Sequence, residues 1–213
     1  MTGEHTTLID KVVTSGTFEL DGGSWAVDNN VWLVGSAREV VVIDAAHDAA
    51  AILERAGLRT VRAIICTHAH NDHINAAAEL AKLTGAPILL HPADQVLWEA
   101  VYGDDVSYTP LTDGQEITAG EITLKVLHTP GHAPGAVCLY APELGVLFSG
   151  DTLFNGGPGA TGRSYSSFDT IVESIKERLL ALPPETVVHT GHGDSTSIGA
   201  EAPHLEEWLT RGH

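Results

Sequence analysis

Runs of apolar residues separated by polar turns predict a chain of short strands and helices. Two early strands are expected at Val31–Val34 and Val40–Ile43, and the second is apolar throughout, as in a strand covered on both faces. A short helix is expected from Asp48 to Ala56, where Gly57 ends it, and a further strand from Val61 to Cys66. This alternation of strand and helix indicates a mixed α/β fold.

A second set of elements follows an expected polar loop from Thr67 to Asp72. From Ile74 onward, apolar residues recur at positions i, i+3, i+4 and i+7, which predicts a helix from about His73 to Leu83. A short strand at Pro87–Leu90 and a helix around Ala93–Ala100 should come next.

The second half of the chain predicts an antiparallel sheet after a hairpin-type turn at Asp113–Gly114. Its expected strands are Glu116–Thr118, Glu121–Leu127, Ala136–Tyr140 and Val146–Ser149. Beyond them we expect a helix, a strand and a C-terminal helix, at residues 167–182, 186–189 and 201–210. Hairpin runs in each half suit two sheets packed face to face with helices outside. That is a four-layer α/β (α+β) arrangement, within a single domain of residues 1–213.

Composition narrows the classes of function. Hydrophobic residues make up 43% of the chain and charged residues 18%, which is ordinary for a globular protein. The formal net charge of −17 repels phosphate backbones and anionic membranes, so we expect neither nucleic acid nor a membrane as partner. Met1–Thr7 has no basic or apolar signal-peptide region, which predicts a cytoplasmic protein. Cys66 and Cys138 each lie in an apolar run and are expected to be buried, unpaired residues.

The candidate chemistry is concentrated in the segment His68-Ala69-His70-Asn71-Asp72-His73, which follows an expected buried strand. Four of its residues carry side chains that bind metals. Three neutral imidazoles and one carboxylate suit Zn²⁺, and they also suit Fe or Mn in a mixed nitrogen and oxygen site. The spacing therefore predicts a metal site rather than an ordinary polar loop.

Three later residues extend this site. His132, Asp151 and His192 each lie in a glycine-containing turn just after an expected strand, as the first cluster does. Residues at the ends of adjacent strands converge in space, and α/β proteins place their sites at such sheet ends. The sequence therefore predicts that these three residues join the first cluster.

This ordered pattern resembles the metallo-β-lactamase superfamily, with Asp44 at a strand end, the H-x-H-x-D-H motif, and then a lone His, Asp and His. The resemblance spans residues 44–192 and implies an αββα sandwich that binds two divalent metal ions, with zinc expected. It implies that His68, His70 and His132 hold one metal, that Asp72, His73 and His192 hold the other, and that Asp151 bridges both. Asp44 would steady the ligand loop, and His128 and His189, which flank ligand segments, could orient ligands through hydrogen bonds.

Within the superfamily, the chain is most similar to small glyoxalase II-like proteins, a group related to hydroxyacylglutathione hydrolases. The segments 128–135 and Gly162-Arg163 resemble the same segments of that group, whereas residues 155–161 depart from its usual loop. The β-lactamases of the fold lack the bridging Asp and are exported, and its ribonucleases need surfaces that hold RNA. Only residues 193–213 follow His192, so we expect the helical extension that holds glutathione to be missing.

The resemblance implies hydrolysis of an acyl or formyl thioester of a small thiol. A hydroxide bridging the two metals, formed because metals lower the pKa of water to about 7, would attack the carbonyl. A thiolate leaves without a strong general acid, which suits a site rich in metal ligands. Asp72 and Asp151 would act in catalysis, and the loop Arg163-Ser164-Tyr165 is expected to border the substrate.

Two other functions stay open. The same metals would suit a lactonase or another ester or phosphodiester hydrolase, and persulfide dioxygenases, which resemble glyoxalase II, use a single iron. A metal count and a side-by-side test of the three substrate classes would separate these alternatives.

Overall fold

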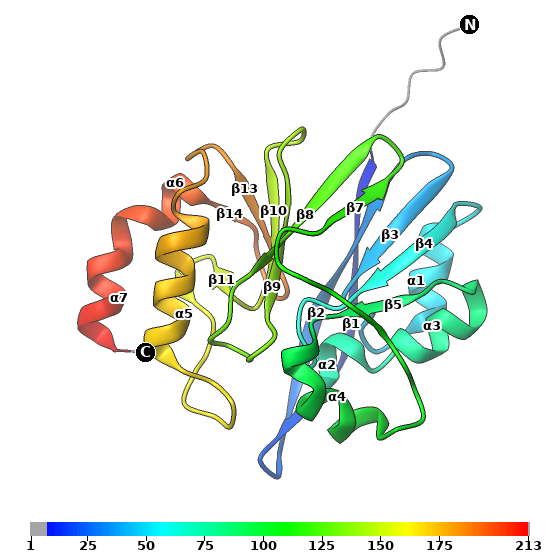
Figure 1. The fold of residues 1–213 in the computed structure, drawn as a ribbon, viewed down its shortest axis with the longest axis horizontal. Coiled ribbons are helices and arrows are strands. Elements are labelled where there is room, and N and C mark those ends of the chain that lie inside the picture. The colour runs from blue at the N-terminus through cyan, green and yellow to red at the C-terminus, as the bar shows by residue number, and fades with distance from the viewer. Residues whose placement is uncertain (1–7, 213) are drawn as a thin grey trace, which may run out of the picture.

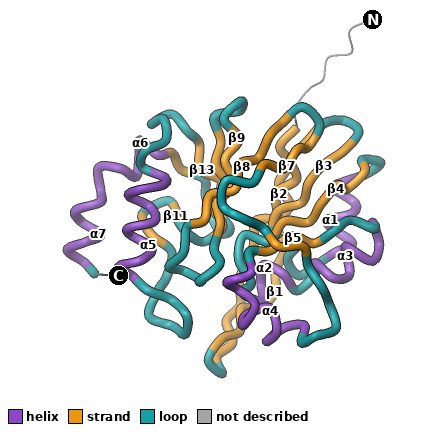
Figure 2. The backbone as a smooth tube through the Cα atoms, in the orientation of Figure 1, coloured by secondary structure: helices purple, strands orange, loops and turns teal. Residues whose placement is uncertain are grey.

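Two six-stranded sheets face one another at the centre of the molecule, and helices cover the outer side of each sheet (Figure 1). The computed structural model describes residues 8–212, so the signal-peptide prediction for Met1–Thr7 lies outside the described residues. Figure 2 shows the helices in two outer layers and the strands between them. The predicted four-layer αββα sandwich is therefore confirmed.

The first sheet has the strand order β1-β2-β3-β4-β5-β6. Its strands are β1 (Leu8–Leu20), β2 (Gly23–Gly35), β3 (Glu39–Ile43), β4 (Thr60–Ile65), β5 (Ile88–Leu90) and β6 (Thr109–Pro110). The first three strands pair antiparallel, whereas β3 to β6 pair parallel. The parallel strands therefore end at one edge, which is where β4 leads into the histidine-rich segment.

The second sheet has the order β14-β13-β10-β9-β8-β7. Its strands are β7 (Glu116–Ala119), β8 (Ile122–His128), β9 (Val137–Ala141), β10 (Val146–Gly150), β13 (Val187–Thr190) and β14 (Thr196–Ser197). The antiparallel run from β7 to β10 is confirmed, and β10 pairs with β13 in parallel. A small separate ladder joins β11 (Leu153–Phe154) to β12 (Gly157–Pro158).

The helices form the outer layers, one set on each side (Figure 1). Beside the first sheet lie α1 (Ala49–Ala56), α2 (Asn71–Ile74), α3 (Ala77–Thr84), a 3₁₀ turn (Pro92–Asp94) and α4 (Gln95–Tyr102). Beside the second sheet lie α5 (Phe168–Ser174) with its π-helical continuation (Ile175–Leu179), α6 (Ile198–Glu201), a 3₁₀ turn (Ala202–His204) and α7 (Leu205–Arg211).

Three apolar cores separate the four layers, and β3 shows why. Val40 and Val42 pack toward the helices of the first sheet, whereas Val41 and Ile43 pack into the core between the sheets. Successive side chains of a strand point to opposite faces, so a strand between two cores must be apolar at every position. The prediction that this strand is covered on both faces is therefore confirmed.

The long hairpin of β1 and β2 was predicted only at its last residues, Val31–Val34. The first half of β2 is exposed or half-buried, so its side chains carry no alternating pattern of burial. Asp21 and Gly22 both have positive φ, 53° and 77°, which is the backbone of a tight two-residue hairpin turn. That Asp-Gly pair was the available sequence signal for this hairpin.

Two other predictions were wrong in detail. The helix expected from His73 to Leu83 is two helices, because the backbone N–H of Ala76 turns away to donate to the carbonyl of Ala45 (3.1 Å). Asp113–Gly114 is not a hairpin turn. It lies in the segment that leaves β6 in the first sheet and enters β7 in the second.

Within the described part of the chain, no helix has both the length and the apolar character needed to cross a membrane. Both cysteines are buried and unpaired, as predicted.

Candidate metal centre

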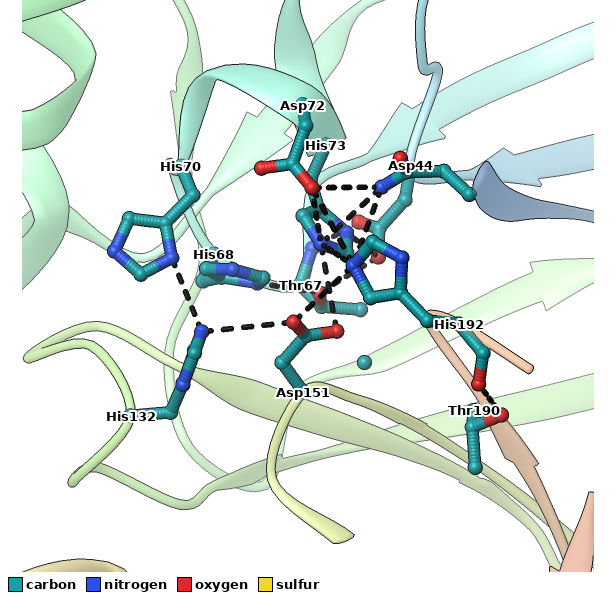
Figure 3. A network of polar contacts seen from close by, with 12 residues as sticks. Asp44, Thr67, His68, His70, Asp72, His73, His132, Asp151, Thr190 and His192 are labelled. Carbon is teal, nitrogen blue, oxygen red and sulfur yellow. Dashed lines mark hydrogen bonds and ion pairs between the residues drawn. The ribbon is translucent and has the colours of Figure 1, made fainter. Parts of the chain in front are cut away.

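All seven predicted ligands meet at one edge of the two sheets (Figure 3). Four of them follow β4, at the start of α2. The others follow β8, β10 and β13, so both sheets contribute to the same site. The seven residues are His68, His70, Asp72, His73, His132, Asp151 and His192.

The first group consists of His68, His70 and His132, whose ligand atoms lie within 4.8 Å of one another. The Nδ1 atom of His70 faces the Nε2 atom of His132 at 3.0 Å. His132 uses its other nitrogen, Nδ1, to donate to the carbonyl of Ala160 (2.8 Å), which leaves Nε2 free as a lone-pair donor. Nε2 of His68 is buried without a hydrogen-bond partner. These atoms form a set of neutral nitrogen donors.

The second group consists of Asp72, His73 and His192. Nε2 of His73 and Nε2 of His192 are 3.2 Å apart, and they lie 3.5 Å and 3.3 Å from Oδ2 of Asp72. Ligand atoms about 2.1 Å from a tetrahedral zinc lie about 3.4 Å from one another, so these separations fit a shared ion.

Asp151 lies between the two groups (Figure 3). Its Oδ2 is 3.6 Å from Nε2 of His132 in the first group and 3.4 Å from Nε2 of His192 in the second. Its Oδ1 is buried without a hydrogen-bond partner, 3.4 Å from Nε2 of His73. A carboxylate in this place has the geometry of a bridge between two metals.

The loop after β13 reaches this close to Asp151 only because it contains glycine. A Cβ atom at Gly191 would lie 2.2 Å from Oδ1 of Asp151 and 2.8 Å from Cε1 of His73. Any larger residue would therefore displace the carboxylate or the histidine.

The electrostatics of the two groups differ. Burial, together with neighbouring histidines, lowers the pKa of His70 to about 3, and burial also lowers the pKa of His132. In the second group, burial opposes protonation of His192, but the charge of Asp151 and the hydrogen bonds to Asp151 and Asp72 together outweigh burial and raise the pKa of His192 to about 10. The second group therefore attracts positive charge strongly, and a divalent cation is the ion that its donor atoms fit.

Asp44 lies where a residue that supports the ligand loop is expected. It is buried, and its Oδ2 accepts hydrogen bonds from Nδ1 of His73 (3.0 Å) and Oγ1 of Thr67 (2.8 Å). Its Oδ1 accepts from the backbone N–H of Thr67 (2.7 Å). Asp44 thereby orients the ring of His73 so that its Nε2 faces Asp72 and His192.

The other two predicted supporting histidines lie outside the ligand contacts. The ring of His128 stacks on His91 at 4.0 Å, and its Nε2 donates to the carbonyl of Pro134 (3.0 Å). The ring of His189 packs on Trp32 at 4.3 Å and pairs with Oγ of Ser195 (2.9 Å). In residues 8–212, no hydrogen bond or ring contact joins either of these histidines to a predicted ligand.

Asp94 is a functional residue that the sequence did not reveal. It is fully buried at the start of α4, and its two carboxylate oxygens accept from the backbone N–H groups of Ala69 (2.8 Å) and Gly135. Burial raises the pKa of Asp94 to about 6. Ala69 lies between two ligands and Gly135 is in the loop of His132, so one carboxylate joins the two ligand loops of the first group.

A cavity of about 240 Å³ opens beside the ligands. Its floor is formed by His70, Asp72, His132, Asp151 and His192. Phe18 and Trp25 of the β1–β2 hairpin also line it, together with Arg163 and Ser164 of the loop after β12. Tyr165, the third predicted substrate contact, is 54% exposed and is not among the residues lining the cavity.

Arg163 is the one arginine or lysine among the described residues that line the cavity. Its guanidinium lies 3.9 Å from the ring centroid of Trp25 and 5.1 Å from that of Phe18. Phe18 in turn contacts the ring of His70, with the centroids 5.2 Å apart. The rings of Phe18 and Trp25 therefore lie between His70 of the first group and the guanidinium of Arg163.

Comparison with known proteins agrees with this geometry. The family model described as the metallo-beta-lactamase superfamily matches residues 25–192. A probable metallo-hydrolase of Bacillus subtilis, YqgX, is 37% identical over 155 residues, which cover 67% of this chain and 73% of that protein. A hydroxyacylglutathione hydrolase of Methylobacillus flagellatus is 34% identical over 197 residues, which cover 86% of this chain and 71% of that protein.

One solved structure has a sequence identity to this chain in the same range as these relatives. The crystal structure of TTHA1623 in a di-iron-bound form has a TM-score of 0.76 and 35% sequence identity to this chain. The match covers 83% of this chain and 93% of TTHA1623.

Proposed function

The chain belongs to the metallo-beta-lactamase superfamily, and from that premise we propose that it is a dinuclear metal-dependent thioesterase acting on small acyl or formyl thioesters. The superfamily and the probable metallo-hydrolase relative support a metal-dependent hydrolase in general. The hydroxyacylglutathione hydrolase relative supports thioester chemistry in particular.

The observation that carries the proposal is that the described residues lining the cavity include no general acid separate from the predicted ligands. Apart from the predicted ligands, the described lining residues are Phe18, Trp25, Val27, Ala160, Arg163, Ser164 and Ser166. None of these side chains donates a proton readily at neutral pH. An alkoxide or amine leaving group needs such a donor, whereas a thiolate with a pKa near 8.5 leaves without one.

In this proposal each part of the site has a separate task. His68, His70 and His132 would hold one metal, and Asp72, His73 and His192 would hold the other, while Asp151 would bind to both. When bound, the metals supply a water of lowered pKa and polarise the carbonyl of the substrate. Phe18 and Trp25 exclude water from one side of the substrate, and Arg163 orients its far end.

The native metals are part of the proposal. Imidazole and carboxylate donors suit zinc, iron and manganese, so zinc, which the sequence resemblance favours, is one of three candidates. The di-iron-bound form of TTHA1623 makes iron an equal candidate for this chain.

A panel of substrates tests the proposed function. We expect the metal-loaded protein to hydrolyse short acyl and formyl thioesters of small thiols with the highest kcat/KM. S-lactoylglutathione, whose two carboxylates would meet only Arg163 in the cavity lining, should be hydrolysed with a raised KM. The panel also contains a lactone and a persulfide, and metal-free protein serves as the control.

Three possible results would contradict different parts of the proposed function. A lactone with the highest kcat/KM would replace thioesters by another ester as the substrate class. Oxygen consumption with the persulfide, by protein holding a single iron, would contradict the hydrolase proposal. A micromolar KM for S-lactoylglutathione would contradict the small-substrate part alone.

The place of Arg163 predicts that good substrates carry one anionic group. Replacing Arg163 by glutamine should raise KM about 10-fold for a thioester that ends in a carboxylate, because a charge-assisted hydrogen bond contributes about 1.5–3 kcal/mol and the exposed arginine is partly screened. The corresponding amide should be hydrolysed with an unchanged KM.

Arg38→Gln is the matched control for this prediction. Arg38 is exposed in the turn between β2 and β3, at the sheet edge opposite the site, and its replacement removes the same charge. An equal rise in KM for the acid and the amide would exclude recognition of an anion by Arg163.

A further inference from the structure

Asn29 lies against the second ligand group, although nothing in its sequence context indicates a role. It is fully buried in β2. Its amide nitrogen, Nδ2, is 3.0 Å from Oδ2 of Asp72, 3.4 Å from Nε2 of His73 and 3.5 Å from Nε2 of His192. Those three ligand atoms are themselves 3.2–3.5 Å apart. The amide nitrogen therefore occupies the fourth corner of a near-regular tetrahedron.

The orientation of this amide follows from three hydrogen bonds behind it. The backbone N–H of His47 donates to Oδ1 of Asn75 (2.6 Å), so the NH₂ group of Asn75 must face Nδ1 of His47 (2.9 Å) and donate to it. Nδ1 of His47 is then an acceptor, and its Nε2 carries the proton. That proton is donated to Oδ1 of Asn29 (2.9 Å), which directs the NH₂ group of Asn29 at the ligands.

The fold holds His47 firmly in this position. Its backbone adopts a left-handed conformation with φ of 59°, which costs a non-glycine residue on the order of 1 kcal/mol or more. β1 passes directly against its ring, because a Cβ atom at Gly16 would lie 2.2 Å from Nδ1 of His47. Asn75 lies just after α2, the helix that carries Asp72 and His73. Asn29, His47 and Asn75 lie outside the metal-binding motif, and the sequence predicts no chemical role for any of them.

We propose that Asn29 is a positioning residue of the second ligand group, oriented through His47 and Asn75. The inference rests on the proposed dinuclear centre. Asn29 presents a hydrogen-bond donor where a ligand atom additional to those of the second group and Asp151 would otherwise lie, and it donates to Oδ2 of Asp72. The carboxylate is thereby oriented, and that corner is closed to a further oxygen ligand.

This role predicts opposite effects for two substitutions at one position. Asn29→Ala removes the donor that orients Asp72 and should weaken binding of the second metal equivalent about 10–100-fold. Asn29→Asp is nearly isosteric and still accepts from His47, but it places a carboxylate oxygen at the fourth corner. It should bind the second equivalent more tightly than the wild type does.

The measurement is a titration of metal-free protein with Co²⁺ or Zn²⁺ against a competing chelator, followed by absorption spectroscopy for Co²⁺. In Asn29→Asp, the Co²⁺ spectrum of the second equivalent should change, because its set of ligand atoms changes. His47→Phe breaks the relay, meaning the hydrogen bonds that link Asn75 through His47 to Asn29, without touching a ligand. It should weaken binding of the second metal equivalent as Asn29→Ala does. His204→Phe, at an exposed histidine outside the relay, is the matched control and should leave both equivalents unchanged.

A purely structural role for Asn29 predicts a different pattern. Weaker binding in both Asn29→Ala and Asn29→Asp, or an unchanged second equivalent in His47→Phe, would overturn the proposal. If the wild-type protein binds only one metal, the proposed dinuclear centre is wrong. This result is distinguishable from a failure of the role proposed for Asn29.

Discussion

Replacement of Asp151 by asparagine should lower kcat by at least about 100-fold, because even the loss of a residue that merely orients a ligand typically costs 10–100-fold. Asp151 contacts both ligand groups, with its Oδ2 3.6 Å from Nε2 of His132 and 3.4 Å from Nε2 of His192. Asparagine has nearly the same shape but no negative charge, and only its one oxygen binds metal. The second metal should therefore be lost or weakened while the fold is retained.

The experiment combines turnover with elemental analysis of bound metal and circular dichroism. Asp104→Asn, an exposed aspartate, removes the same charge far from the ligands and should behave as the wild type. Near wild-type turnover in Asp151→Asn with two metals bound would exclude Asp151 from the mechanism.

Removal of the metals by a chelator should abolish hydrolysis, and full activity should return only after two metal equivalents per chain are added. Metal-free protein should also unfold at a lower temperature. Asp44, Asp72 and Asp151 crowd carboxylate charge into a buried site. An ion present at 1,000 times its Kd stabilises the folded state by about 4.1 kcal/mol.

The stoichiometry is measured by elemental analysis of protein reloaded with one metal at a time. Activity that is complete after the first equivalent, with no binding of a second, would refute the dinuclear proposal and favour the single-iron alternative. A metal-free protein with an unchanged melting temperature would show that bound metal adds nothing to the stability of the fold.

The sequence predicted that these seven residues converge because their signal is local. Each of the four ligand segments follows an apolar run that forms a strand, and β8, β10 and β13 run in the same direction within one sheet, so they end at the same edge. The histidine-rich segment after β4 contains four ligands within six residues, a density that ordinary loops do not have. Convergence of the seven residues therefore followed from strand assignments that the structure bears out.

Residues that act through hydrogen bonds gave no such signal. Asn29 lies within a strand, where an asparagine is ordinarily explained by exposure, and its partner His47 is distant in sequence from Asn75. Asp94 precedes a helix, where an aspartate is common for capping reasons alone. Their roles depend on distances between loops, and these distances exist only once the fold has formed.

The β1–β2 hairpin shows a different limit of sequence patterns. Hydrophobic periodicity reports which side of a strand is buried, so it detects Val31–Val34, which packs in the cores, and misses the exposed residues before it. The helix expected over residues 73–83 was misjudged for a similar reason. Its apolar face is continuous in sequence, whereas the break at Ala76 comes from a contact with Ala45, which is remote in sequence.

The origin of the residues that line the cavity has a consequence for how the substrate preference of this protein can change in evolution. Phe18 and Trp25 come from the β1–β2 hairpin and Arg163 from the loop after β12, and none of the seven predicted ligands lies in either segment. Mutations that lengthen these two segments or change their side chains alter the cavity without replacing any of the seven predicted ligands. Under the proposed function, the substrate preference can therefore change in a descendant of this chain while all seven predicted ligands are kept.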